Sequence, residues 1–162
     1  MPYTPRSIAA LAPVIALGAG LAGPVSAQAS ATNVRTAVQR QTREVTNSPA
    51  ARRLRAATAS NASQARKLVG PLEAYERRLH RAATDVSHAS TSSSTQRTAR
   101  TDWVSGIRDD ARAFGQLATA FRDLERGDKT GARREVATAK RTALAAEKLV
   151  LQADSKLKLR TA

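Results

Sequence analysis

The sequence predicts an all-α fold, a small up-down bundle of three to four helices. Apolar residues recur at intervals of three and four positions over long stretches, which is the period of an α-helix. No stretch alternates between apolar and polar residues as a half-buried strand does. Alanine and arginine, two strong helix formers, are abundant throughout the chain.

The core of this bundle is expected to be thin. Residues 28–162 contain 22 Leu, Ile, Val and Phe, a low content that is typical of disorder when it accompanies high charge. The regular spacing of these residues argues for a folded chain, because random placement would rarely produce several in-phase stripes. We therefore expect one folded domain whose core is lined largely by alanine.

Residues 1–27 have the features of a cleavable secretory signal peptide. A single cation, Arg6, precedes an apolar run over 8–22, and Val25-Ser26-Ala27 offers small residues to a signal peptidase. The run covers about 15 residues, fewer than the roughly 20 that span a bilayer. No cysteine follows it for a bacterial lipid anchor. The sequence predicts a secreted or extracytoplasmic protein of the cell envelope, with no transmembrane anchor after cleavage.

The first half of the mature chain is predicted to hold a weakly helical segment over 28–47 and a long kinked helix over 48–90. Asn47-Ser48-Pro49 joins capping residues to a proline at the first helical position. Gly70-Pro71 lies inside the long helix, and we expect a kink there because proline removes one backbone hydrogen bond. The heptad seam comprises Ala65, Leu68, Leu72, Tyr75, Leu79, Ala82, Val86 and Ala89.

The second half is predicted to be a helical hairpin. A Ser/Thr-rich loop over 90–97 precedes a helix over 98–126, and Gly127-Asp128 separates it from a last helix over 129–159. So short a turn makes the two helices antiparallel neighbours. The first stripe comprises Trp103, Ile107, Ala111, Phe114, Ala118 and Phe121, and the second Ala132, Val136, Ala139, Ala143, Ala146, Val150, Ala153 and Leu157.

Positive charge is the main functional signal. The chain has 27 Lys and Arg against 13 Asp and Glu, a net charge of +14. Residues 28–101 hold 13 cations and 4 acids, whereas residues 102–162 hold 13 cations and 9 acids. The first half therefore carries most of the excess. The candidate anion-binding residues are Arg52, Arg53, Arg55, Arg66, Lys67, Arg77, Arg78 and Arg81.

Such a basic face suits anionic cell-wall polymers, acidic polysaccharide, anionic lipid headgroups or an acidic partner protein. The alternative is a solvated helix face in a genome rich in arginine codons; the composition resembles that of small secreted proteins of high-GC Gram-positive bacteria. Nucleic acid is disfavoured as the physiological ligand, because the protein is expected to be exported and Tyr75 is the one aromatic residue among these arginines.

The sequence contains no pattern that indicates catalysis, and no cofactor or metal is expected. It lacks cysteine, which excludes disulfides and cysteine nucleophiles. His80 and His88 form no metalloprotease motif, and surface positions are expected for both. Tyr75 and His80 could be considered as haem ligands, but Tyr75 occupies a seam position, so we expect it to pack in the core instead. Asp109 and Asp110 point in different directions on a helix, so they do not form an acid–base pair.

These observations predict a non-catalytic secreted helical protein that binds an anionic polymer or an acidic partner. One alternative is a chaperone-like or inhibitory protein-binding module that exposes part of the Trp103–Leu124 stripe. A remote alternative is a small secreted enzyme with an arginine-lined pocket. A homodimer is also possible, because heptad seams on alanine-rich helices pair between chains as readily as within one.

Overall fold

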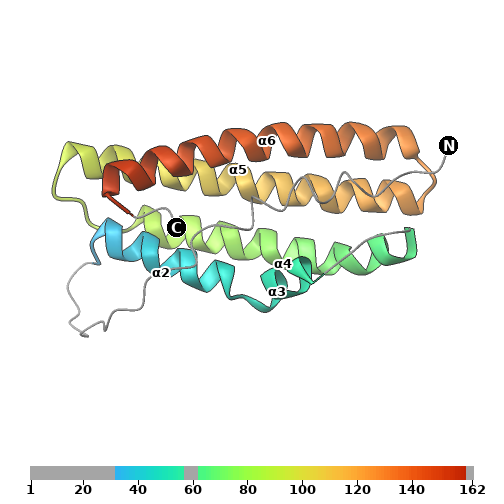
Figure 1. Ribbon diagram of the computed structural model, residues 1–162, viewed down its shortest axis with the longest axis horizontal. Coiled ribbons are helices and arrows are strands. Elements are labelled where there is room, and N and C mark those ends of the chain that lie inside the picture. Colours follow the sequence, from blue (N-terminus) through green and yellow to red (C-terminus); the bar gives the residue numbers. More distant parts are fainter. Residues whose placement is uncertain (1–31, 57–61, 160–162) are drawn as a thin grey trace.

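The computed structural model describes residues 32–56 and 62–159, in which every named element is an α-helix (Figure 1). The predicted all-α bundle is therefore confirmed. The predicted signal peptide lies outside the described residues and stays a prediction. Within the described ranges, no helix is long and apolar enough to cross a membrane. The helices are α2 (Val34–Thr46), α3 (Pro49–Arg55), α4 (Ala62–Ser87), α5 (Ser94–Glu125) and α6 (Lys129–Leu157).

The single helix expected over 48–90 is wrong, because the structure has two helices there. The first, α3, begins after the predicted Ser48 cap, whose side chain accepts a hydrogen bond from the Ala51 amide. It ends at Arg55, with Ala56 as its C-cap, and α4 begins at Ala62. The predicted heptad seam starts at Ala65, so the spacing of apolar residues did not itself predict helix between Arg55 and Ala62.

One helix runs through Gly70-Pro71, as the unbroken phase of the seam predicted. Pro71 lies inside α4, and the apolar positions on both sides of it face the same core. Tyr75, Leu79 and Val86 are fully buried, and Leu68 is partly buried. The seam therefore continues in phase across the missing backbone hydrogen bond of the proline.

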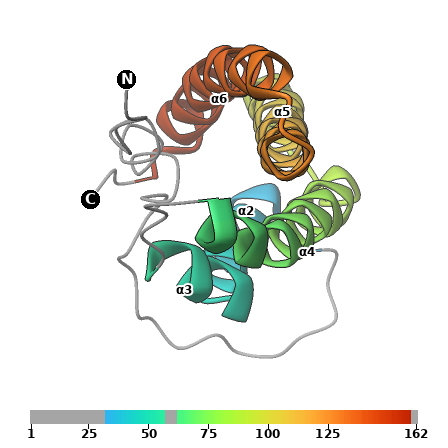
Figure 2. The same cartoon turned by 90° about the vertical axis from the view of Figure 1, so that its right-hand side faces the viewer.

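The helices form an up-down arrangement with α5 in the middle (Figures 1 and 2). Helix α5 packs along α6 on one side and along α4 on the other, while α2 and α3 pack mainly on α4. The expected C-terminal hairpin is thus confirmed. Helix α5 begins at Ser94, four residues earlier than expected, because the side chain of Ser93 caps it by accepting from the Gln96 amide. The predicted loop is correspondingly shorter.

Small residues allow α5 and α6 to pack closely. The α6 seam that faces α5 is mainly alanine, with Ala139, Ala143 and Ala146 buried. Across from it, Gly106 of α5 has so little room that an added Cβ would lie 2.8 Å from Val150 Cγ2 and 2.9 Å from the Ala146 carbonyl oxygen. Gly106 is therefore required for this helix separation.

Gly106→Ala should lower the free energy of unfolding by about 1–3 kcal/mol, because α6 backbone must move away to admit the methyl group. Urea denaturation followed by circular dichroism measures the change. The matched control is Gly115→Ala on the same helix, where the new Cβ meets only the movable carboxylate end of Glu76. Equal effects of the two substitutions would contradict the proposed close approach.

Candidate functional site

The eight predicted anion-binding residues lie on two neighbouring helices. Helix α3 carries three of them and α4 carries five, and the two helices pack against each other. Both lie at the edge of the fold away from α6 (Figure 2). The structure therefore brings the predicted residues to one region of the molecule, but it gives them different roles.

Three of the eight make contacts within the fold. The Arg55 guanidinium donates to the Thr46 carbonyl oxygen at 2.6 Å. Arg66 Nε lies 3.0 Å from Glu125 Oε1 and so links α4 to the end of α5. Arg78 pairs with the carboxylate of Glu44 on α2. These contacts commit the three arginines to holding helices together.

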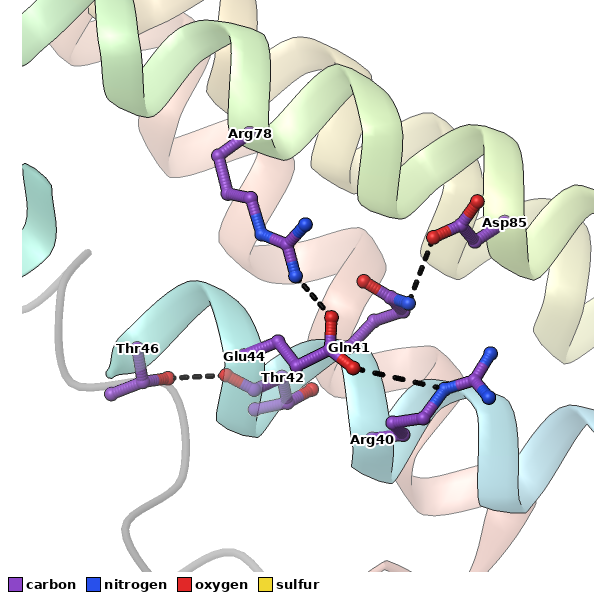
Figure 3. A network of polar contacts seen from close by, with 7 residues as sticks. All are labelled: Arg40, Gln41, Thr42, Glu44, Thr46, Arg78 and Asp85. Carbon is purple, nitrogen blue, oxygen red and sulfur yellow. Dashed lines mark hydrogen bonds and ion pairs between the residues drawn. The ribbon is translucent and has the colours of Figure 1, made fainter. Parts of the chain in front are cut away.

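Arg78 belongs to a polar seam between α2 and α4 (Figure 3). The Glu44 carboxylate forms an ion pair with Arg78 of α4, and its Oε1 atom lies 3.9 Å from Nε of Arg40 on its own helix. Beside this cluster, Gln41 Nε2 donates to Asp85 Oδ2 at 2.9 Å. Because Gln41 is buried, its contact with α4 is shielded from solvent. The seam joins α2 to α4 through two polar contacts, Arg78 with Glu44 and Gln41 with Asp85.

The other five residues form what we call the basic surface. All five are exposed, and in the described part of the chain none is within ion-pair distance of a carboxylate. Residues 1–31, 57–61 and 160–162 contain no Asp or Glu at all. Arg77 and Arg81 are one helical turn apart on α4, so their guanidinium groups emerge on the same side. The members of the basic surface are Arg52, Arg53, Lys67, Arg77 and Arg81.

A second group of cations, on α6, was missed because the charge was summed over the whole of residues 102–162. These residues are also exposed, and none has an ion pair among the described residues. The half-chain balance hid them because acids of that half pair elsewhere, for example Asp102 with Lys156 and Asp109 with Arg112. A shorter window over α6 would have found them. They are Lys129, Arg133, Arg134, Lys140, Arg141 and Lys148.

Asp110 is a buried carboxyl group in the middle of the core. Its relative exposure is 2%, and its Oδ1 atom has no hydrogen-bond partner. Burial, with a smaller contribution from Glu147 of α6, raises the pKa of Asp110 to about 7. Burial also raises the pKa of Tyr75, with Asp110 adding to the effect and Arg55 opposing it. Arg55 of α3 and Asp110 of α5 thus both act on one buried tyrosine of α4, while Glu147 of α6 acts on Asp110.

The remaining candidate residues from the sequence are two aspartates, two histidines and Tyr75. Asp109 pairs with Arg112 at 2.8 Å, whereas Asp110 has no ion pair among the described residues. His80 and His88 are exposed. No group of three His, Asp or Glu in the described ranges is placed to hold a metal ion. Tyr75 packs in the core, edge-on to Phe114 with ring centroids 4.6 Å apart.

The aromatic stripe of α5 is not a surface. Trp103, Phe114 and Phe121 are all buried in the common core. The protein-binding alternative named the wider stripe from Trp103 to Leu124, of which Leu124 is partly buried; that alternative stays a prediction. The aromatic residues serve packing.

Comparisons with known proteins add no family to this description: no family model, no curated protein and no solved structure matches the chain.

Arg78→Gln should lower the free energy of unfolding by about 1 kcal/mol, because it removes the ion pair with Glu44 that joins α2 to α4. The adjacent exposed Arg77 supplies the control, since Arg77→Gln should change stability by less than about 0.5 kcal/mol. Chemical denaturation of both variants distinguishes the two roles. A larger loss in Arg77→Gln would show that these assignments are reversed.

The buried Asp110 should make stability depend on pH. Its pKa rises from 3.8 to about 7 on folding, so between these values the folded state binds more protons than the unfolded state. Its contribution to stability is fully present below pH 3.8, falls by at most about 1.4 kcal/mol per pH unit as pH rises, and levels off above pH 7.

Asp110→Asn should abolish this component. The difference in unfolding free energy between variant and wild type, measured at half-unit steps from pH 4 to 8.5, should grow in favour of the variant up to about pH 7. Asp109→Asn removes the same charge from the paired neighbouring position and separates burial from net charge. A pH-independent difference for Asp110→Asn would refute the assignment.

Proposed function

We propose that this protein is a secreted, non-catalytic helical protein that binds anionic polymers of the cell envelope through the basic surface on α3 and α4. The observation that supports the proposal most directly is the absence of ion-pair partners for Arg52, Arg53, Lys67, Arg77 and Arg81 among the described residues. Of the three acids on these helices, Glu73 pairs with Arg122, Asp85 accepts from Gln41, and Glu76 lies 4.0 Å from His80 Nε2.

The chemistry of the basic surface suits a polymer that carries phosphate or carboxylate groups. Four of its five members are arginines, whose planar guanidinium groups form bidentate hydrogen bonds with such oxyanions. Each exposed contact is weak because water and salt screen it. A repeating polyanion offers many such contacts at once, so useful affinity arises from their number rather than from one deep pocket.

The proposal requires no catalytic group. The exposed histidines have no metal-binding arrangement in the described ranges, and the unpartnered carboxyl of Asp110 is buried in the core rather than placed on the basic surface. Binding by long-range attraction and many surface contacts is compatible with both features.

Retention on isolated bacterial cell walls tests the proposal. The exported protein should be retained at about 20 mM salt and released at about 0.5 M, because the Debye length falls several-fold over this range. Retention that is indifferent to salt, or no retention at low salt, would rule the proposal out.

Arg77→Gln combined with Arg81→Gln should weaken retention at low salt about tenfold. The matched control is Arg97→Gln combined with Arg108→Gln, which removes two exposed cations from α5 and should have a much smaller effect. Equal losses in the two double variants would mean that net charge, not the basic surface, controls binding.

A further inference from the structure

Helix α6 exposes two large apolar side chains on the side that faces away from α5. Leu144 is 56% exposed and Leu151 is 48% exposed, the two large hydrophobic residues so exposed in the described ranges. Seven residues separate them, which is two helical turns, so they lie on the same side of the helix. The buried seam through Ala143 and Ala146 occupies a different side, against α5. Burial within the described fold therefore gives no account of these leucines.

Cations surround the two leucines. Lys140 and Lys148 lie one turn before and one turn after Leu144, and both are exposed. Arg141 is also exposed, and its one recorded side-chain contact is with Thr138 Oγ1 at 3.4 Å. The surface between the leucines is hollowed, and Glu147 is the one acid among the described residues that line it. We call Lys140, Arg141, Leu144, Lys148 and Leu151 the leucine–cation face.

We propose that the leucine–cation face docks on the surface of an anionic lipid bilayer. The leucines would insert at the boundary between headgroups and acyl chains, and the three cations would lie at the phosphate groups. This combination distinguishes the face from the basic surface of α3 and α4, which pairs its cations with no comparably exposed large apolar residue. A soluble polyanion would contact the cations but would not bury the leucines.

Charge complementarity favours a lipid surface over a second copy of the chain. Two leucine–cation faces placed together would bring Lys140, Arg141 and Lys148 of each copy close to those of the other, and Glu147 alone offers opposite charge. Anionic headgroups instead supply negative charge beneath every cation. The inference is independent of the proposed function, because α6 and α3 lie at opposite edges of the fold in both views (Figures 1 and 2).

Co-sedimentation with lipid vesicles tests the inference. The exported protein should bind vesicles that contain one third phosphatidylglycerol in phosphatidylcholine, and should bind pure phosphatidylcholine at least tenfold more weakly. Leu144→Ser combined with Leu151→Ser should weaken binding to the anionic vesicles about 100-fold, or tenfold per leucine. Circular dichroism should show unchanged helix content, because both leucines are exposed and their replacement leaves the core intact.

Charge variants complete the design. Lys140→Gln, Arg141→Gln and Lys148→Gln together should weaken vesicle binding about 100-fold, or roughly fivefold per cation. The control Arg77→Gln with Arg81→Gln should leave vesicle binding nearly unchanged while it weakens retention on cell walls. The leucine double variant should do the reverse, so the two proposals fail separately.

Two results would overturn the inference. One is vesicle binding that the leucine substitutions leave unchanged, which would reduce the face to general electrostatic attraction. The other is a dimer in sedimentation equilibrium that the same leucine substitutions dissociate, with no binding to anionic vesicles; a second copy of the chain would then be the occupant.

Discussion

The fold depends on the close approach of α5 and α6. A chain with so few large apolar residues gains little from bulky side chains, so it must bury its area by bringing helix backbones together. Gly106 and the alanine seam of α6 permit this approach. The aromatic residues of α5 then fill the common core that α5 shares with the other helices. Without the first contact, the second layer of packing would have no fixed surface on which to form.

Polar groups complete the association of the helices, and they carry a cost. The pairs of Arg78 with Glu44 and of Arg66 with Glu125 connect α4 to α2 and to the end of α5. In the core, however, Asp110 is buried with an oxygen that has no partner, and the half-buried Asp154 of α6 also has one buried oxygen without a partner. Burial raises the pKa of both carboxyl groups, to about 7 and about 6 respectively. The core therefore favours their neutral forms, which links folding to proton uptake.

The surface charge is divided between two edges of the molecule. The basic surface of α3 and α4 lies at one edge, and the leucine–cation face of α6 lies at the other (Figure 2). The first has cations alone and suits a polymer in water; the second adds exposed leucines and suits an interface. Together they would allow one small protein to contact a polyanion and a lipid surface at the same time, with α5 as the rigid element between them.

The sequence by itself determined the elements whose signal is local. Periodicity placed the core stripes of α4, α5 and α6, because side-chain direction along a helix follows residue number. Composition likewise identified the excess of cations on α3 and α4. The boundary between α3 and α4 was not predicted, because the apolar spacing that indicates α4 begins only at Ala65.

Only the tertiary structure decided which charged residues are available. Arg77 and Arg78 are adjacent and chemically identical, yet one faces solvent and the other pairs with Glu44 across 34 residues of chain. Asp109 and Asp110 differ in the same way, one paired at the surface and the other buried. Leu144 and Leu151 fit the spacing of a core, and they are exposed because α6 packs against α5 through its alanines instead. Pairing and burial depend on which helix lies opposite, and that is a property of the assembled fold.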